Sequence, residues 1–176
     1  MKKSRWLLLV ALAAIVAAAF GGKVLATPPT TPGFSGTTLA KATIAALHIK
    51  AHAKPGHWKV DLKTKEDSDL YVQQNTWDPS LCGGCVPGTG WHTHPGPSII
   101  IVTQGTVTAY EGDDPTCTPH VYSATGANSL VDIGGGDVHI IRNESGAVAK
   151  TVAVQFVPKG ADRRIDVTPG NPHCPF

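Results

Sequence analysis

The stretch GWHTHPGPSIIIVTQG, residues 90–105, decides the fold because it joins a histidine pair to a rigid turn and an apolar strand. His92 and His94 are two positions apart, so in an extended chain both imidazoles point to the same face. A Pro-Gly-Pro turn follows, and the apolar run 98–103 leads into Gln104-Gly105, which is typical of a hairpin. The pattern predicts paired strands that present two imidazoles on one face.

The rest of the chain also favours strands over helices. Short β-branched or alternating runs occur at 58–63, 70–72, 106–110, 129–133, 138–141 and 148–157. Turn residues separate them, among them three glycines at 134–136 and Asn-Glu-Ser-Gly at 143–146. Several short strands with no long helical pattern predict an all-β sandwich or barrel.

A third histidine, His139, lies on a separate predicted strand just after the three glycines. Two histidines spaced one residue apart are a weak signal alone, because surface histidines are common. With a third imidazole from another strand, the set supplies most of a metal coordination shell. The third histidine, His139, therefore strengthens the weak signal for a metal site that His92 and His94 give.

These residues resemble the two motifs of the cupin superfamily. The first motif has two spaced histidines, a glutamate and a glycine, and His92, His94, Ser98 and Gly105 match its spacing. The second matches at Gly134, Gly136, His139 and Asn143, with glycine in place of the proline. Small secreted bacterial cupins also share runs similar to residues 90–97 and 110–117. The resemblance covers residues 58–158 and implies a double-stranded β-helix, a jelly-roll barrel, with one divalent metal held inside by the three histidines.

The chain departs from the cupin pattern at Ser98, which occupies the position of the usual glutamate ligand. Three neutral imidazoles without a carboxylate disfavour hard ions and favour Zn, Cu, Ni or Fe(II). They also leave coordination positions open to water or a substrate. The alternative is a pocket without metal, in which the histidines only form hydrogen bonds.

Four other polar residues are candidates for the pocket around the histidines. Ser98 is expected beside the ligands, and Asn143 shares the parity of His139 along its strand. Gln155 interrupts an apolar run. It is expected either to line the pocket or to lie at a sheet edge in contact with solvent. Tyr110 lies on the second strand of the predicted hairpin and is placed to reach the same interior.

The chain divides into five predicted parts. Residues 1–26 combine a basic start, an apolar run and small residues before a cleavage site, which indicates a signal peptide. The other parts are a linker or extended arm at 27–37, an arm of uncertain structure (edge strand or short helix) at 38–57, the barrel at 58–158 and a C-terminal tail at 159–176. We expect a secreted protein that meets a membrane only through an uncleaved signal segment.

Charge argues against a nucleic-acid partner. Cleavage after residue 26 removes four of the 15 Lys and Arg residues and no acid, so the mature chain has a formal net charge of −2. A small-molecule ligand remains the expected partner. The run Ile99–Ile101 is apolar on both faces of its strand, and cupins often dimerise, so a homodimer is also expected.

The four cysteines predict two disulfides in an exported chain. Three pairings are possible, and spacing favours a local Cys82–Cys85 bridge and a long Cys117–Cys174 bridge that ties back the tail. For the Cys82–Cys85 pair, a redox-active or thiolate metal role is the alternative to a loop bridge.

Three function hypotheses follow. The first is a metal-dependent enzyme, such as an oxygenase acting on a small organic substrate. The second is a non-catalytic module for a metal or small ligand, and the third is a structural barrel without metal. The sequence has no recognisable nucleophile–base motif that would favour another chemistry.

Overall fold

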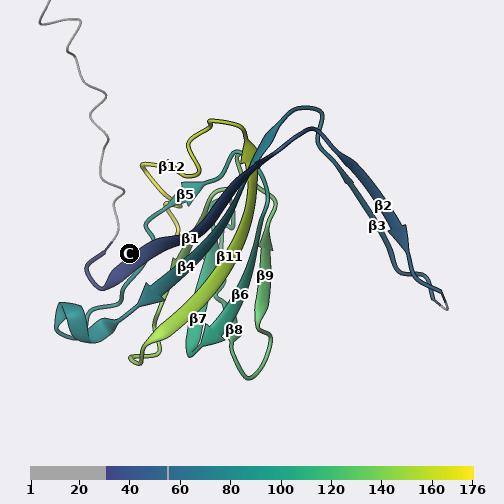
Figure 1. Cartoon of the computed structure of the whole chain (residues 1–176). Helices are drawn as coiled ribbons and strands as arrows, with labels where there is room; N and C mark the ends of the chain where they lie inside the picture. The colour runs from purple at the N-terminus through teal and green to yellow at the C-terminus, as the bar shows by residue number, and fades with distance from the viewer. Residues whose placement is uncertain (1–30, 55) are drawn as a thin grey trace, which may run out of the picture.

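The computed structural model describes residues 31–54 and 56–176, and within them the regular secondary structure is almost entirely β-strand (Figure 1). The predicted signal peptide, 1–26, lies outside the described residues. The strands are β1 Phe34–Ile44, β2 His48–His52, β3 Lys59–Lys63, β4 Ser68–Trp77, β5 His92–Thr93, β6 Ser98–Gln104, β7 Thr106–Glu111, β8 His120–Ser123, β9 Ser129–Asp132, β10 His139–Arg142, β11 Ala149–Pro158 and β12 Ile165–Asp166. A short 3-10 helix, η1 Pro79–Cys82, begins at Asp78, whose side chain caps it.

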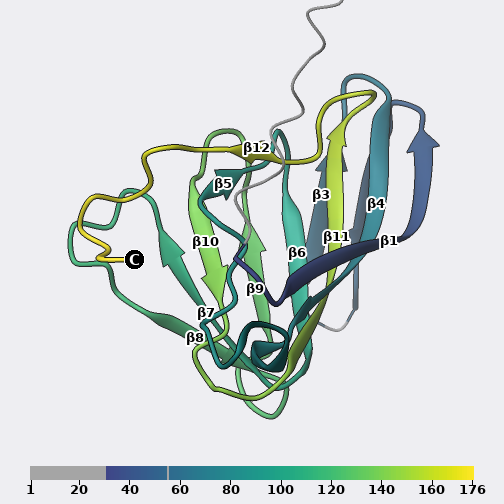
Figure 2. The same cartoon turned by 90° about the vertical axis from the view of Figure 1, so that its left-hand side faces the viewer.

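Two five-stranded antiparallel sheets face each other (Figure 2). One has the order β1-β4-β11-β6-β9 and the other β12-β5-β10-β7-β8. From β4 to β11 the chain crosses between the sheets at every connection except the β7–β8 hairpin, so each sheet collects strands far apart in sequence. This is the connectivity of a jelly roll, and it confirms the predicted all-β double-stranded β-helix.

The segment before the predicted barrel is also part of the fold. β1 forms the edge of the first sheet through a long register with β4, from Phe34 opposite Trp77 to Ile44 opposite Ser68. The first sheet therefore begins within the expected linker. The first part of the arm of uncertain structure, up to Ile44, is an edge strand of this sheet. β2 and β3 then form a separate two-stranded hairpin that projects away from the sandwich (Figure 1).

β6 shows how the sequence separates the interior from the surface. Ser98, Ile100 and Val102 are buried between the sheets, whereas Ile99 and Ile101 are 47 % and 43 % exposed on the outer face. The apolar core fills one part of the interior and comprises Trp77, Ile100, Val102, Val107, Ala109, Ile141, Ala149 and Ala153. Ser98, at the start of β6, points into the same interior at the edge of this core.

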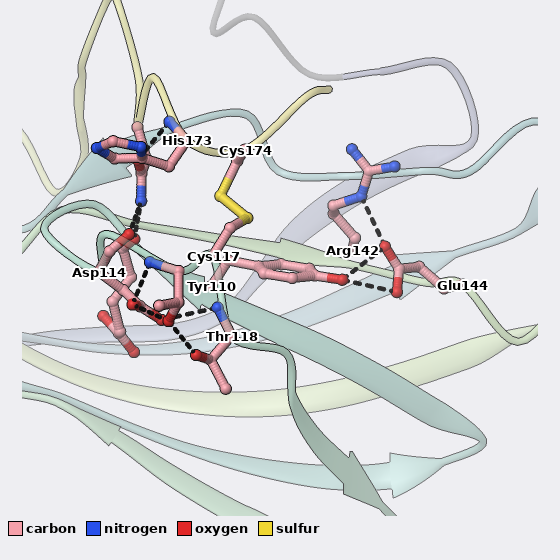
Figure 3. Close-up of a disulfide and its surroundings, with 11 residues drawn as sticks. Tyr110, Asp114, Cys117, Thr118, Arg142, Glu144, His173 and Cys174 are labelled. Carbon is pink, nitrogen blue, oxygen red and sulfur yellow. Dashed lines mark hydrogen bonds and ion pairs between the residues drawn. A yellow bond between two sulfur atoms is a disulfide. The ribbon is translucent and has the colours of Figure 1, made fainter.

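Both disulfides occur in the pairs that spacing favours. Cys82–Cys85 closes the end of η1, in a loop and not at the start of a long helix. Cys117–Cys174 fastens the C-terminal tail to the segment after β7 (Figure 3). Such bridges are compatible with an extracytoplasmic protein.

Among residues 31–54 and 56–176, no helix has the length and apolar character needed to cross a bilayer.

Candidate metal centre

Two neighbouring strands of the second sheet bring the three histidines together. His92 on β5 and His139 on β10 are direct cross-strand partners, so their side chains lie on the same face. His94 follows two residues after His92 and joins them. The ring centroids are 4.4 Å apart for His92 and His139, 4.9 Å for His92 and His94, and 5.5 Å for His94 and His139. One nitrogen from each ring lies within 4.8 Å of the other two, which is close enough to share one ion.

Backbone carbonyls orient two of the imidazoles. Nδ1 of His92 lies 2.8 Å from the carbonyl oxygen of Gly90, and Nδ1 of His94 lies 2.6 Å from that of Arg163. A carbonyl only accepts hydrogen bonds, so each Nδ1 carries the proton and each Nε2 keeps its lone pair. Holding the far ring nitrogen in this way is how proteins orient metal-binding histidines.

His139 and its surroundings fit a metal ion. Of the five buried side-chain nitrogen and oxygen atoms without a hydrogen-bond partner in the described structure, four belong to this site. They are both ring nitrogens of His139, Oγ of Ser98 and Oδ2 of Asp132. Buried polar atoms are normally paired, because leaving one unpaired costs about 1–3 kcal/mol. A cation with vacant coordination positions would satisfy this cluster.

Burial keeps the imidazoles neutral, as ligands must be. It lowers the pKa of His94 to about 4 and that of His139 to about 3, and it lowers the pKa of His92 well below its usual value. The neighbouring histidine charges add to the effect at His92 and His139. The lone pairs therefore stay available across the neutral pH range.

The first sheet faces the histidines with a row of three polar residues. Ser98 on β6 is the register partner of Gln155 on β11 and of Asp132 on β9, so the three side chains share the inner face. Gln155 Nε2 lies 3.4 Å from Nε2 of His94, and its Oε1 accepts a hydrogen bond from Nη1 of Arg163. Ser98 is fully buried. Both residues therefore lie beside the site, and of the two alternatives for Gln155 the structure has the pocket residue and not the edge residue.

Asp132 was not singled out from the sequence. Its Oδ2 lies 3.7 Å from Nε2 of His94, and its Oδ1 lies 3.9 Å from Nδ1 of His139. Oδ1 also accepts a hydrogen bond from the Gly134 amide. Burial raises the pKa of the carboxyl to about 6. The sequence signal that could have identified Asp132 is its position, since it is an acid at the end of a short strand just before the glycines of the second motif.

A cavity of about 230 Å³ opens onto the histidines between the two sheets. Ile100, Ile141 and Ala153 line its apolar part, while Arg163 and Arg164 contribute positive charge. Arg164 is neutralised by Asp166, at 2.7 Å. Within the part of the chain that the structure describes, Arg163 has no carboxylate partner and donates to the neutral amide of Gln155. The cavity therefore offers a cationic group to a small anion.

Tyr110 and Asn143 do not reach this cavity, which corrects the expectation for both. The Tyr110 hydroxyl donates to the carboxylate of Glu144 outside the sandwich interior (Figure 3), and its ring packs on Phe176. Asn143 lies just after β10, where strand parity no longer applies. Its amide donates to the carbonyls of Trp77 and Ala147, which shapes the turn before β11.

The strand order and the histidine positions define this chain as a jelly-roll protein with a buried three-histidine pocket. The two sequence motifs around these histidines resemble those of the cupin superfamily.

No family model matches the chain, and no curated protein sequence matches it. Solved structures are similar at low identity. An oxalate oxidase shares 17% identity over 56% of this chain and 46% of its own, with a TM-score of 0.43. A cupin superfamily protein from Desulfitobacterium hafniense shares 10% over 69% of this chain and 81% of its own, with a TM-score of 0.39. A polyketide cyclase from Streptomyces resistomycificus shares 14% over 59% of this chain and 65% of its own, with a TM-score of 0.43.

This chain spans less than half of the oxalate oxidase and about two thirds of the polyketide cyclase. Likeness at this level says nothing about substrate, and the fold assignment rests on the strand order itself.

Proposed function

We propose that this chain is a secreted cupin that binds one divalent transition metal through His92, His94 and His139 and presents it to a small organic anion. The observation that carries the proposal is the cluster of buried, unpartnered donor atoms around His139. The fixed orientation of His92 and His94 by backbone carbonyls supports it. The signal-like segment 1–26 and the two disulfides support export.

The cavity supports access of a small molecule to the site. A bound metal would supply Lewis-acid or redox chemistry at its open positions. The chain itself would hold the anion near the metal through Arg163, orient His94 through the Arg163 carbonyl and exclude bulk water with the apolar wall. On this basis we propose a metal-dependent oxygenase or related enzyme acting on a small organic acid. A non-catalytic metal or ligand carrier is the second candidate, since no Asp or Glu lines the described cavity.

Metal content tests the binding step. The mature protein is stripped, reconstituted with Zn, Cu, Ni or Fe(II) under anaerobic conditions, and analysed for bound metal. We expect about one equivalent for the native chain and less than a tenth for His139→Ala, because one ring and its two free nitrogens are lost. His120→Ala is the control, because this histidine is exposed and lies outside the trio. Native protein that retains no metal would contradict the proposal.

Oxygen consumption separates the enzyme from the carrier. The metal-loaded protein is tested against panels of small hydroxy acids, phenols and diketones, with His139→Ala as the blank. Uptake that needs both the substrate and the histidines supports an oxygenase. Saturable binding of a compound without turnover supports the carrier.

A further inference from the structure

Asp132 occupies the position from which a carboxylate can replace the missing cupin glutamate. Ser98 stands at the glutamate position, and Asp132 is its direct cross-strand partner on β9. Opposed residues of an antiparallel pair carry side chains on one face, with Cβ atoms about 5 Å apart. The carboxylate of Asp132 therefore lies one strand away from the position that the glutamate ligand takes in the cupin motif.

The carboxylate is buried, and one of its oxygens is free. Asp132 is 5 % exposed, and Oδ2 is a buried atom without a hydrogen-bond partner. Oδ1 is held by the amide of Gly134 at 2.8 Å, which leaves Oδ2 directed at the histidines. Burying a carboxylate costs several kcal/mol unless a positive charge or hydrogen bonds compensate for it. No Lys or Arg within the described residues pairs with Asp132, so the Gly134 hydrogen bond to Oδ1 compensates for only part of this cost.

A metal ion at the three histidines would compensate for that cost. Oδ2 lies 3.7 Å from Nε2 of His94, the nitrogen left free by the backbone hydrogen bond at Nδ1. This is too long for a hydrogen bond, but two ligands about 2.1 Å from one ion lie at about this separation. Oδ1 lies 3.9 Å from the otherwise unpartnered Nδ1 of His139.

We propose that Asp132 supplies the carboxylate of this metal centre, so that the site is three histidines and one acid drawn from three different segments of the chain. The proposal rests on metal binding by the histidines. It changes the expected metal preference, because a carboxylate in the site offsets part of the ion's charge and readmits harder ions such as Mn(II).

Metal affinity of Asp132→Asn tests the proposal. Asparagine keeps the Oδ1 acceptor for Gly134 and the shape of the side chain while removing the charge. Competition titrations with Zn(II) and Mn(II) on the full mature chain give the dissociation constants. We expect Zn(II) binding to weaken about 10- to 100-fold, as for other carboxylates that support metal ligands, and Mn(II) binding to weaken more.

Two further variants separate charge from structure. Ser98→Glu in the Asp132→Asn background puts the acid at the cupin position, where Ser98 lines the cavity. It should recover at least tenfold of the lost affinity, which a merely structural role of Asp132 would not allow. Asp137→Asn, which changes a nearby acid whose side chain makes no hydrogen bond to the trio, should bind as the native chain does. The metal-free Asp132→Asn protein should also unfold at or above the native temperature, because it buries no unpaired charge.

The outcomes are distinct from those of the proposed function. If the native chain binds no Zn(II), the proposed function fails. If the native chain binds Zn(II) and Asp132→Asn binds it with unchanged affinity, only the role of Asp132 is overturned. Failure of Ser98→Glu to restore affinity, with a folded double variant, would also count against it.

Discussion

Gly134 lies directly against Gly96, the middle residue of the turn that follows the histidine pair. A Cβ on Gly134 would stand 2.3 Å from the carbonyl oxygen of Gly96, and Gly134 has a φ of +68°. The contact joins the two histidine motifs, because one glycine precedes β6 and the other precedes β10. Both the left-handed backbone and the close approach require glycine at position 134.

We expect Gly134→Ala to destabilise the protein by about 2 kcal/mol or more, from the left-handed backbone and the forced separation of the two turns. Metal affinity should fall too, because the Gly134 amide holds Asp132. Gly135→Ala is the matched control. Its φ is also +68°, but nothing lies within 4 Å of its added Cβ, so only the backbone cost of about 1 kcal/mol should appear. Urea unfolding measures both, and equal losses would show that the contact is unimportant.

Asp69 fastens the edge strand to the sandwich. The buried carboxylate accepts hydrogen bonds from Thr43 Oγ1 at 2.7 Å and from the Gly160 amide at 3.1 Å, and it pairs with Lys41 Nζ at 2.9 Å. The Thr43 hydroxyl, Lys41 and the Gly160 amide together lower its pKa to about 2. The ionised form is thus favoured in the folded state, and its contribution to stability is present above about pH 4 and is lost as the pH falls toward 2.

We expect Asp69→Asn to lower the melting temperature by about 5 °C at pH 7. The difference in melting temperature between the native chain and the variant should shrink as the pH falls from 4 to 2. Thermal unfolding across that range measures it. Thr43→Val removes the donor that contributes most to the low pKa and keeps the carboxylate. It should therefore show a smaller loss at pH 7 and a weaker pH dependence than the native chain. A constant gap between Asp69→Asn and the native chain at all pH values would contradict the assignment.

How far the sequence could predict this molecule depends on which interactions are local. The histidine pair and the hairpin turn are local, and together with the spacing of the second motif around His139 they were sufficient for the fold class and the trio. The strand Phe34–Ile44 was recognised only as one of two alternatives for part of its length, because an edge strand with small and polar residues has little burial pattern: only its two end residues are even partly buried.

The remaining differences come from tertiary registers. Asp132 reaches the histidines only because β9 pairs with β6, and no local spacing encodes that pairing. The expectation for Tyr110 was wrong because β7 is buried on both faces: Ala109 faces the core, and Tyr110 packs beneath the C-terminal tail. A strand covered on both sides carries no alternation that tells inside from outside.

The two disulfides should differ in their contribution to stability. Cys117–Cys174 spans 57 positions, and Cys82–Cys85 spans three. The loop-entropy model assigns about 4 kcal/mol to the longer bridge and about 2 kcal/mol to the shorter one. Replacing each pair with serines and measuring unfolding in urea without reductant should reproduce that order. A larger loss from the Cys82–Cys85 pair would mean that its loop has a role beyond chain entropy.

The backbone and the side chain of Arg163 have different roles, one in metal binding and the other in anion binding. Its carbonyl orients His94, whereas its side chain lines the cavity without an acid partner among the described residues. Arg163→Met therefore keeps the carbonyl and removes the charge. We expect unchanged Zn(II) affinity and at least a tenfold loss of affinity for malonate on the Zn(II)-loaded protein, since hydrogen bonds to a charged group contribute about 1.5–3 kcal/mol.

Calorimetric titration of malonate into the loaded protein measures this loss. Lys159→Met serves as the control, because this exposed lysine pairs with Asp67 and does not line the cavity. It removes the same charge from the chain, so equal losses in the two variants would indicate a general electrostatic effect. Unchanged malonate affinity in Arg163→Met would remove the anion from the proposed function while leaving the metal centre intact, because only the side chain has been altered.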